Sequence, residues 1–345
     1  MSLTIEKLKE FIQSAVQMKQ PDVAVAQYLR QVKLTEKLDD ATVEELQKKG
    51  AGPKTVAALR SMVDASASLP EAAPSIPKPV YVPPPPPDSV EQGKILDEVR
   101  DYVMNYTKGL PNFICVQVTR RYVDASAKGT AFHNTDTITA KLTYDGQHED
   151  YEVTLRNNQP LTNVKMEDLG GTTSQGEFGT MMKEIFEPDS NARFGWDHWG
   201  TLRGRRVYVF SYDIAQANSR YRVEEKDTKQ SIMPAYRGLI YVDRDTKMVT
   251  KITMNPYDIP PDFPIQDLHT TLDYDFAKIA DGTYMLPLKA VLTSRATRYA
   301  TKNEIEFRLY RKFETGSTIK FDTPDPLPED QTKEKPAEEP KVKKQ

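Results

Sequence analysis

Apolar and polar residues alternate along much of the second half of the chain, from about Thr137 to Phe313. Ile305, Phe307 and Leu309, for example, alternate with charged residues. This period of two predicts antiparallel strands with one buried and one solvated face. Asp-Gly pairs at positions 145 and 281 suit the tight turns between such strands. The strands are predicted at Phe113–Val123, Thr137–Tyr144, Tyr151–Leu155, Arg206–Ile214, Gly238–Val242, Met248–Met254, Thr271–Phe276, Tyr284–Ser294 and Glu304–Phe313.

A sheet of this length must curl or close to hide its apolar face and its edges. Two segments with apolar residues at helical spacing, Ser89–Thr107 and Glu177–Glu187, are predicted to cover its hollow. Residues 89–323 are therefore predicted to form an α+β domain. Its architecture would be a curved antiparallel half-open β barrel with covering helices.

The chain begins with a different pattern. Leu8, Phe11 and Ile12 have the spacing of one face of an amphipathic helix, and similar spacing recurs to about residue 69. Residues 1–69 are predicted to form a small all-α N-terminal module. Residues 70–88 contain nine prolines, five of them consecutive, and are predicted to be an extended proline-rich linker. Residues 324–345 have almost no apolar side chains and are predicted to be a disordered tail.

The composition excludes several classes of protein. The 345 residues carry a net charge of −3, which gives no field that favours nucleic acid or anionic membranes. The mean hydropathy is −0.62, and no apolar run approaches the roughly 20 residues that a membrane helix needs. The single cysteine, Cys115, excludes an internal disulfide, and its apolar neighbours predict a buried, inert thiol. No signal peptide is visible, so the protein is either cytoplasmic or shown without a leader that was removed.

Motifs for catalysis and cofactor binding are not found in the sequence. It contains no nucleophile elbow, phosphate-binding loop or dinucleotide fingerprint. Its four histidines do not have the spacing of metal ligands. The sequence therefore predicts a protein that is not an enzyme and that has no cofactor and no metal site.

Five residues are candidates for binding an apolar ligand. Met181 and Met182 are adaptable side chains on the second predicted helix, and Phe186 lies on the same apolar stripe. Trp196 and Trp199 could stack on a flat ligand, and we expect them to share a face only in a turn. Each group has a second interpretation. The methionine stripe is equally typical of a helix that packs on a sheet. The two tryptophans are also typical of side chains buried between a sheet and a helix.

The segment Leu46–Thr55 resembles the hairpin of helix-hairpin-helix nucleic-acid modules. In those modules a Gly-x-Gly turn offers backbone N–H groups to a phosphate, and Gly50 and Gly52 occupy the matching positions. Residues 1–80, however, carry 11 basic and 10 acidic side chains. A net charge of +1 favours a packing or protein-docking module over a phosphate-binding one, so nucleic acid is an unlikely partner.

Several strings of the chain resemble a family of mostly exported bacterial proteins with no established activity. These strings are Leu110–Tyr122, Gly176–Gly179, Trp196–Gly204, Gly238–Asp245 and Glu304–Arg311. The resemblance covers nearly the whole chain. It implies a periplasmic or otherwise extracytoplasmic location and a leader peptide before the first residue shown.

The main domain is also similar to lipoprotein-carrier and outer-membrane lipoprotein-sorting domains. The order of its elements and the strings Tyr274–Phe276 and Asp281–Pro287 carry this second resemblance. It implies an incomplete β barrel whose hollow, covered by helices, shelters acyl chains. We therefore predict an extracytoplasmic binding or carrier-like protein for an apolar ligand, a lipidated partner or an envelope protein. The alternatives are a cytoplasmic nucleic-acid-associated protein that uses the Leu46–Thr55 hairpin, and an enzyme of unknown class.

Overall fold

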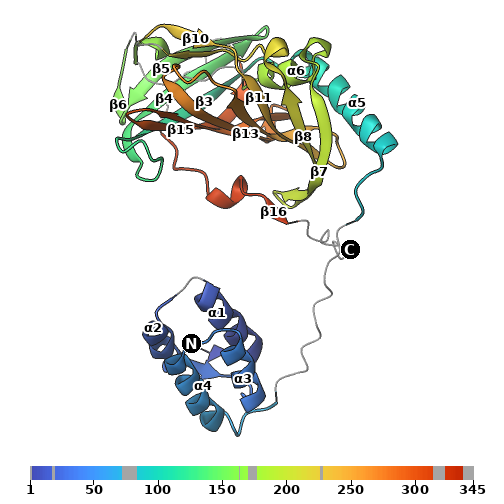
Figure 1. Cartoon of the computed structure of the whole chain (residues 1–345). Coiled ribbons are helices and arrows are strands. Elements are labelled where there is room, and N and C mark those ends of the chain that lie inside the picture. Colours follow the sequence, from blue (N-terminus) through green and yellow to red (C-terminus); the bar gives the residue numbers. More distant parts are fainter. Residues whose placement is uncertain are drawn as a thin grey trace. The chain divides into compact units, whose positions relative to one another are not determined.

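The computed structural model describes residues 2–17, 20–71, 84–162, 164–169, 177–225, 228–313 and 323–336. The chain divides into two units, Met1–Val80 and Tyr81–Gln345, and each has its own hydrophobic core (Figure 1). Most of the predicted proline-rich linker (72–83) and the end of the predicted tail (337–345) lie outside the described residues.

Helices form most of the described part of the N-terminal unit. They are α1 (Ile5–Gln17), α2 (Asp22–Leu29), α3 (Asp40–Lys48) and α4 (Pro53–Ala65). Their apolar faces meet in a core that includes Leu8, Leu29, Leu46 and Leu59. The all-α prediction missed a parallel pair formed by β1 (Ser2–Leu3) and β2 (Lys33–Leu34), because two-residue strands are too short to give a periodic pattern.

A twelve-stranded antiparallel sheet makes up most of the described part of the second unit. The strand order is β16-β7-β8-β11-β12-β13-β14-β15-β3-β4-β5-β6, with β16 and β6 at the two open edges. A short separate pair is formed by β9 (Val223–Glu225) and β10 (Gln230–Ile232). The strands of the large sheet are β3 (Phe113–Asp124), β4 (His133–Asp145), β5 (His148–Arg156), β6 (Gln159–Pro160), β7 (Arg193–Leu202), β8 (Arg205–Ile214), β11 (Ala235–Asp243), β12 (Val249–Tyr257), β13 (Ile265–Ile279), β14 (Gly282–Ala296), β15 (Ala300–Lys312) and β16 (Lys335–Pro336).

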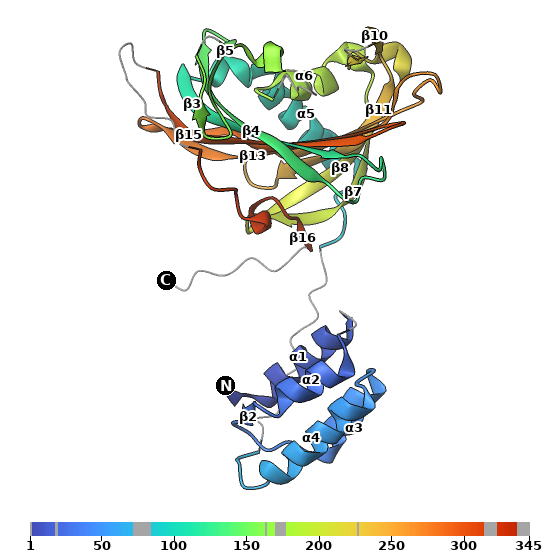
Figure 2. The same cartoon turned by 90° about the vertical axis from the view of Figure 1, so that its left-hand side faces the viewer.

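The predicted α+β architecture, with an open, curved antiparallel sheet, is confirmed (Figure 2). Most strands run past their predicted ends. Strand β13, for example, covers Ile265–Ile279 rather than Thr271–Phe276. The apolar alternation marks only the part of each strand that lies over the core, whereas the hydrogen-bonded ladder continues beyond it.

Two helices, α5 (Ser89–Asn105) and α6 (Thr180–Phe186), lie on the concave face of the sheet (Figure 2). Helix α5 begins at Ser89 because the Asp88 carboxylate accepts hydrogen bonds from the N–H groups of Val90 and Glu91, both at 2.9 Å. No helix among the described residues is long and apolar enough to cross a membrane. Single 3₁₀ turns occur at η1 (Thr107–Gly109), η2 (Met166–Leu169), η3 (Pro188–Ser190), η4 (Gln216–Asn218) and η5 (Glu329–Gln331).

The convex face of the sheet is partly covered as well, which differs from the predicted solvated face. Strand β3 is buried on both sides from Phe113 to Arg120. Residues 323–336, called the C-terminal segment below, lie across the convex side (Figure 2). The sequence predicted a disordered tail from residue 324. Over residues 324–336 the structure shows an ordered segment instead, because polar side chains of the sheet bind its main chain. Composition does not reveal contacts of this kind.

The end of the predicted linker also belongs to the second unit. Pro87 is buried, and its carbonyl accepts a hydrogen bond from the Gln92 side chain at 2.8 Å. The Pro85 carbonyl accepts one from the Trp199 indole at 3.2 Å. Because proline has no N–H group that needs a partner, these residues can lie against the domain with only their carbonyls bonded.

Gly238→Ala should destabilise the sheet. A Cβ atom at Gly238 would lie 1.9 Å from the carbonyl oxygen of Thr253 on the neighbouring strand β12, so the two strands would have to separate. We expect the free energy of unfolding of the second unit to fall by at least about 2 kcal/mol in urea titrations. Gly93→Ala is the matched control. A Cβ atom there meets nothing within 4 Å on helix α5, and we expect a gain of about 0.5–1 kcal/mol. Equal stability of the two variants would contradict this account.

Candidate ligand-binding site

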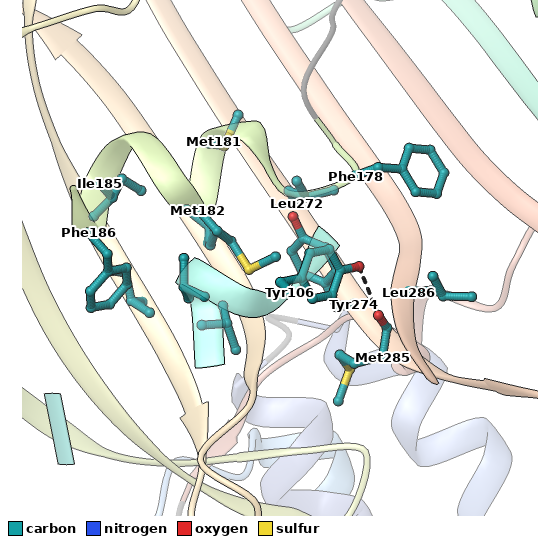
Figure 3. Close-up of a cluster of buried hydrophobic side chains, with 14 of the residues drawn as sticks. Tyr106, Phe178, Met181, Met182, Ile185, Phe186, Leu272, Tyr274, Met285 and Leu286 are labelled. Atoms are coloured by element: carbon teal, nitrogen blue, oxygen red, sulfur yellow. Dashed lines mark hydrogen bonds between the residues drawn. The ribbon is translucent and has the colours of Figure 1, made fainter. Parts of the chain in front are cut away.

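Three of the five predicted ligand residues lie on α6, and Figure 3 shows Met182 directed toward Tyr106 and Tyr274 and Met181 on the other side of the helix. Met182 is fully buried (0% exposed), and Met181 and Phe186 are also buried. Phe186 stacks on Phe194 of β7, with ring centroids 5.0 Å apart. These side chains therefore fill the space between the helices and the sheet, which is the packing interpretation of the stripe.

The position of α6 is set by a glycine. Gly179, immediately before the helix, has a φ of +117°, which only glycine adopts readily. A Cβ atom there would lie 2.7 Å from the Tyr106 ring. The start of α6 is thus pressed against the residue that ends α5, and the two helices contact each other as one layer.

Tyrosine hydroxyls anchor this layer to the sheet. The Tyr106 hydroxyl donates to the Met285 carbonyl at 2.8 Å (Figure 3), and the Tyr274 hydroxyl donates to the Glu177 carbonyl at 2.8 Å. Burial raises the pKa of both hydroxyls well above the usual value. They therefore remain protonated and act as fixed donors.

Two other tyrosines in the same cluster are different. The hydroxyls of Tyr102 and Tyr144 are buried and have no hydrogen-bond partner among the described residues. Tyr102 lies on α5 with its ring 5.8 Å from that of Tyr106, and Tyr144 stacks on Phe113 at 4.9 Å. A buried polar group without a partner costs about 1–3 kcal/mol. Sequence analysis missed these residues, because helical spacing and strand alternation mark them only as core positions.

The two tryptophans share a face, but in a strand rather than in a turn. Strand β7 contains a bulge between Trp196 and His198, where the pairing with β8 shifts by one residue. The extra residue brings Trp196 and Trp199 to the same side, with ring centroids 5.2 Å apart. Both are partly buried and pack against the concave core. The structure thus brings all five predicted residues into one hydrophobic cluster.

Cys115 lies in the same cluster and is buried, as predicted. Burial raises the pKa of its thiol well above the usual value, so the reactive thiolate is absent at neutral pH. Within the described ranges, no group of three or more His, Cys, Asp and Glu side chains is arranged to hold a metal ion.

Two amides of the Leu46–Thr55 hairpin in the N-terminal unit are bound by a side chain of the same chain. The Asp22 carboxylate accepts hydrogen bonds from the N–H groups of Lys54 and Thr55, both at 2.9 Å, and from the Thr55 hydroxyl at 2.7 Å. A Cβ atom at Gly52 would lie 2.4 Å from the Asp22 carboxyl carbon. The glycine therefore makes room for a carboxylate of the same chain at the place where a nucleic-acid module binds phosphate.

Comparison with solved structures finds distant likenesses to the second unit. A LolA superfamily protein from Nitrosomonas europaea is 10% identical, with a TM-score of 0.34, and the match covers 64% of this chain and 93% of that one. A putative outer membrane lipoprotein-sorting protein domain from Vibrio parahaemolyticus is 13% identical, with a TM-score of 0.31 and coverage of 66% and 94%. A DUF1329 family protein from Desulfovibrio piger is 9% identical, with a TM-score of 0.31 and coverage of 66% and 94%.

Lipoprotein-sorting domains are also among the proteins that the sequence of the main domain resembles. At these identities and TM-scores the structural likenesses assign no function. No family model and no curated protein sequence matches the chain.

Met182→Ala should destabilise the second unit, because Met182 is fully buried in the concave core. We expect a loss of about 2–5 kcal/mol in the free energy of unfolding, measured by urea titration. Met233→Ala is the control, since Met233 is 50% exposed and its replacement should change stability by less than about 0.5 kcal/mol. A small effect at Met182 would show that α6 does not depend on this contact.

Asp22→Ala should weaken the N-terminal unit in a pH-dependent way. The hydrogen bond from the Thr55 hydroxyl, followed by those from the backbone N–H groups of Lys54 and Thr55, lowers the pKa of Asp22 below its usual value of 3.8. A carboxylate with a lowered pKa stabilises the fold fully above the unfolded-state pKa, and this contribution is lost as the pH falls through the folded-state pKa.

We therefore expect Asp22→Ala to lower the thermal midpoint of this unit at pH 7 and to change it much less near pH 2, as followed by NMR amide signals of the full chain. Asp64→Ala is the control, because it is an exposed change near the other end of α4, the helix whose first amides bind Asp22. An equal loss at both pH values would contradict the capping role.

Proposed function

We propose that the second unit is a non-enzymatic binding or carrier protein for an amphipathic ligand that lies against the concave face. The observation that carries this proposal is the pair of buried hydroxyls of Tyr102 and Tyr144, which have no partner among the described residues. Tyr102 lies on α5 and Tyr144 on β4, and both belong to the largely apolar cluster between the helices and the sheet. A ligand with an apolar chain and one or two acceptor oxygens would satisfy both features.

Binding requires α6 to move, because Met182, Ile185 and Phe186 now occupy the concave face. The ligand would replace one apolar surface with another, so the gain of about 25 cal/mol per Å² from burying its chain offsets the loss of helix contacts. Helix α6 is only seven residues long, but four of its side chains are buried, so displacing it exposes all four. The ligand must therefore supply enough binding energy to shift the population toward the state in which α6 is displaced.

The chemistry of the cluster supports binding rather than catalysis. Burial raises the pKa of the Cys115 thiol and of the Tyr106 and Tyr274 hydroxyls well above their usual values. At neutral pH none of these groups is a thiolate or phenolate, so none of them can serve as nucleophile or general base.

The sequence resemblance to exported proteins supports an extracytoplasmic location as part of this proposal. Under the same proposal the ligand is a lipid, the acyl chain of a lipidated protein or an apolar part of an envelope protein. The nucleic-acid alternative is disfavoured because the Asp22 carboxylate already binds the N–H groups of Lys54 and Thr55 in the Leu46–Thr55 hairpin.

A fluorescent fatty acid tests the proposal in titrations with the full chain. We expect binding at micromolar concentration. The double variant Tyr102→Phe with Tyr144→Phe should bind about tenfold more weakly, since two donors are lost. Its stability should be equal to that of the wild type or higher, because the removed hydroxyls have no partner among the described residues.

Tyr106→Phe is the matched control on the same aromatic stack. It removes the hydrogen bond to the Met285 carbonyl, so it should lower stability by about 1 kcal/mol and leave the affinity for the probe unchanged. Absence of probe binding to the wild type, or an unchanged affinity in the double variant, would overturn the proposal.

A further inference from the structure

The C-terminal segment crosses almost the whole convex face of the sheet. It starts next to β4, where the Thr323 and Thr139 hydroxyls are 2.7 Å apart. It ends beyond the last long strand, where Lys335 and Pro336 pair with Thr201 and Gly200 of β7. The side chains that contact it on this face define what we call the convex groove. They are Arg120, His198, Arg203, Tyr241, Lys251, Glu306 and Arg308.

The first part of the groove is organised by a buried carboxylate. Glu306 is 0% exposed and accepts a hydrogen bond from the backbone N–H of Leu327 at 3.0 Å. The guanidinium groups of Arg120 and Arg308 lie 3.2 and 3.3 Å from this carboxylate. The same two arginines donate to the carbonyls of Pro324 (3.0 Å) and Asp325 (3.4 Å). The groove here binds three main-chain groups of the segment, two carbonyls and one N–H.

The middle of the groove has the same character. Arg203 donates to the Gln331 carbonyl at 3.1 Å, and Lys251 donates to the Thr332 carbonyl at 2.9 Å. Both cationic side chains are 13% exposed and lie 3.6 Å from the buried Asp273 carboxylate. The sheet also holds these side chains through contacts that do not involve the segment, which limits the side-chain entropy lost when the segment binds.

The last part of the groove is a pocket for one glutamate. Glu334 accepts hydrogen bonds from His198 Nε2 at 2.6 Å and from the Tyr241 hydroxyl at 2.9 Å. A Cβ atom at Gly200 would lie 2.5 Å from its Oε1, so the glycine makes room for the carboxylate. Burial lowers the pKa of His198, but the hydrogen bonds with Glu334 and Asp197 outweigh it and raise the pKa above the usual value. The imidazole is thus suited to bind a negative charge.

The segment matches these contacts. Pro324, Pro326 and Pro328 stand at alternate positions, where they favour an extended chain and present no N–H group that needs a partner. Most contacts are to main-chain carbonyls and one amide. The carbonyls of Gln331 and Thr332 lie at the end of the 3₁₀ turn η5, so a matching peptide is extended at its prolines and turns once before the glutamate. Side-chain selection is concentrated at Glu334. After it, the chain adds as an edge strand to β7, a common mode of peptide recognition.

We propose that the convex groove is a recognition site for a proline-rich peptide in which one turn separates the prolines from a glutamate and a short edge strand, with residues 323–336 of the same chain as its resident occupant. Because the segment belongs to the same chain as the groove, its effective concentration at the groove is of the order of millimolar. A peptide of the same chemistry binds in trans only when the resident segment is weakened.

The test uses the full chain and a fluorescently labelled peptide of residues 323–336, followed by fluorescence anisotropy. Glu334→Gln in the chain weakens the resident segment and leaves the groove intact. We expect the labelled peptide to bind this variant at least about tenfold more tightly than the wild type. Adding Tyr241→Phe, which removes one donor from the pocket, should reverse most of this gain. Glu329→Gln removes an exposed charge from the same segment and should behave as the wild type.

Hydrogen exchange of residues 323–336 is measured on the same proteins. Faster exchange in Glu334→Gln without tighter peptide binding would show that the groove does not accept a peptide in trans, and would overturn the proposal. Unchanged exchange together with unchanged peptide binding would show that the glutamate pocket does not hold the segment, and would overturn it as well.

Discussion

The antiparallel pairing of β3 with β15 is the contact on which the rest of the second unit depends. It joins strands from the two ends of the domain, from Asp124 opposite Ala300 to Phe113 opposite Lys312. Without it the β7–β15 meander and the β3–β6 hairpins would be separate, smaller sheets. The pairing makes the concave face continuous, so that Phe178 of the helical layer contacts both Phe113 and Phe307. On the other face it places Arg120 beside Glu306.

Both faces of this sheet are covered, but by different chemistry. The concave face is apolar and aromatic and is covered by α5 and α6, with two hydroxyls that lack partners among the described residues. The convex face carries charged side chains fixed by ion pairs, which hold the main chain of the C-terminal segment. Apolar contacts are not directional, which is why we propose a ligand chain at the concave face. Hydrogen bonds to carbonyls are directional, which is why we propose a peptide at the convex face.

One local irregularity serves both faces. The bulge in β7 between Trp196 and His198 turns both indoles toward the concave core. It also directs His198 to the convex side, where its ring contacts Glu334 and lies 6.5 Å from Tyr241. A regular strand would place residues 196 and 199 on opposite faces, because the side-chain period is two. The sequence pattern of residues 196–199 therefore does not match the alternation of a regular strand.

The sequence by itself determined the local elements and their class. Alternation over Ile305–Leu309 and the Asp-Gly turns predicted the antiparallel sheet, and helical spacing predicted α5 and α6, since burial of one face imposes these periods. It also placed Met182 and Phe186 on the face that is buried. Tertiary structure decided what periodicity cannot encode. The order that sets β3 against β15, the bulge at Trp196, the burial of the Tyr102 and Tyr144 hydroxyls and the ordered C-terminal segment all depend on residues far away in the chain. The segment lacks an apolar pattern because its binding energy comes from main-chain hydrogen bonds, which every sequence can make and no composition reveals.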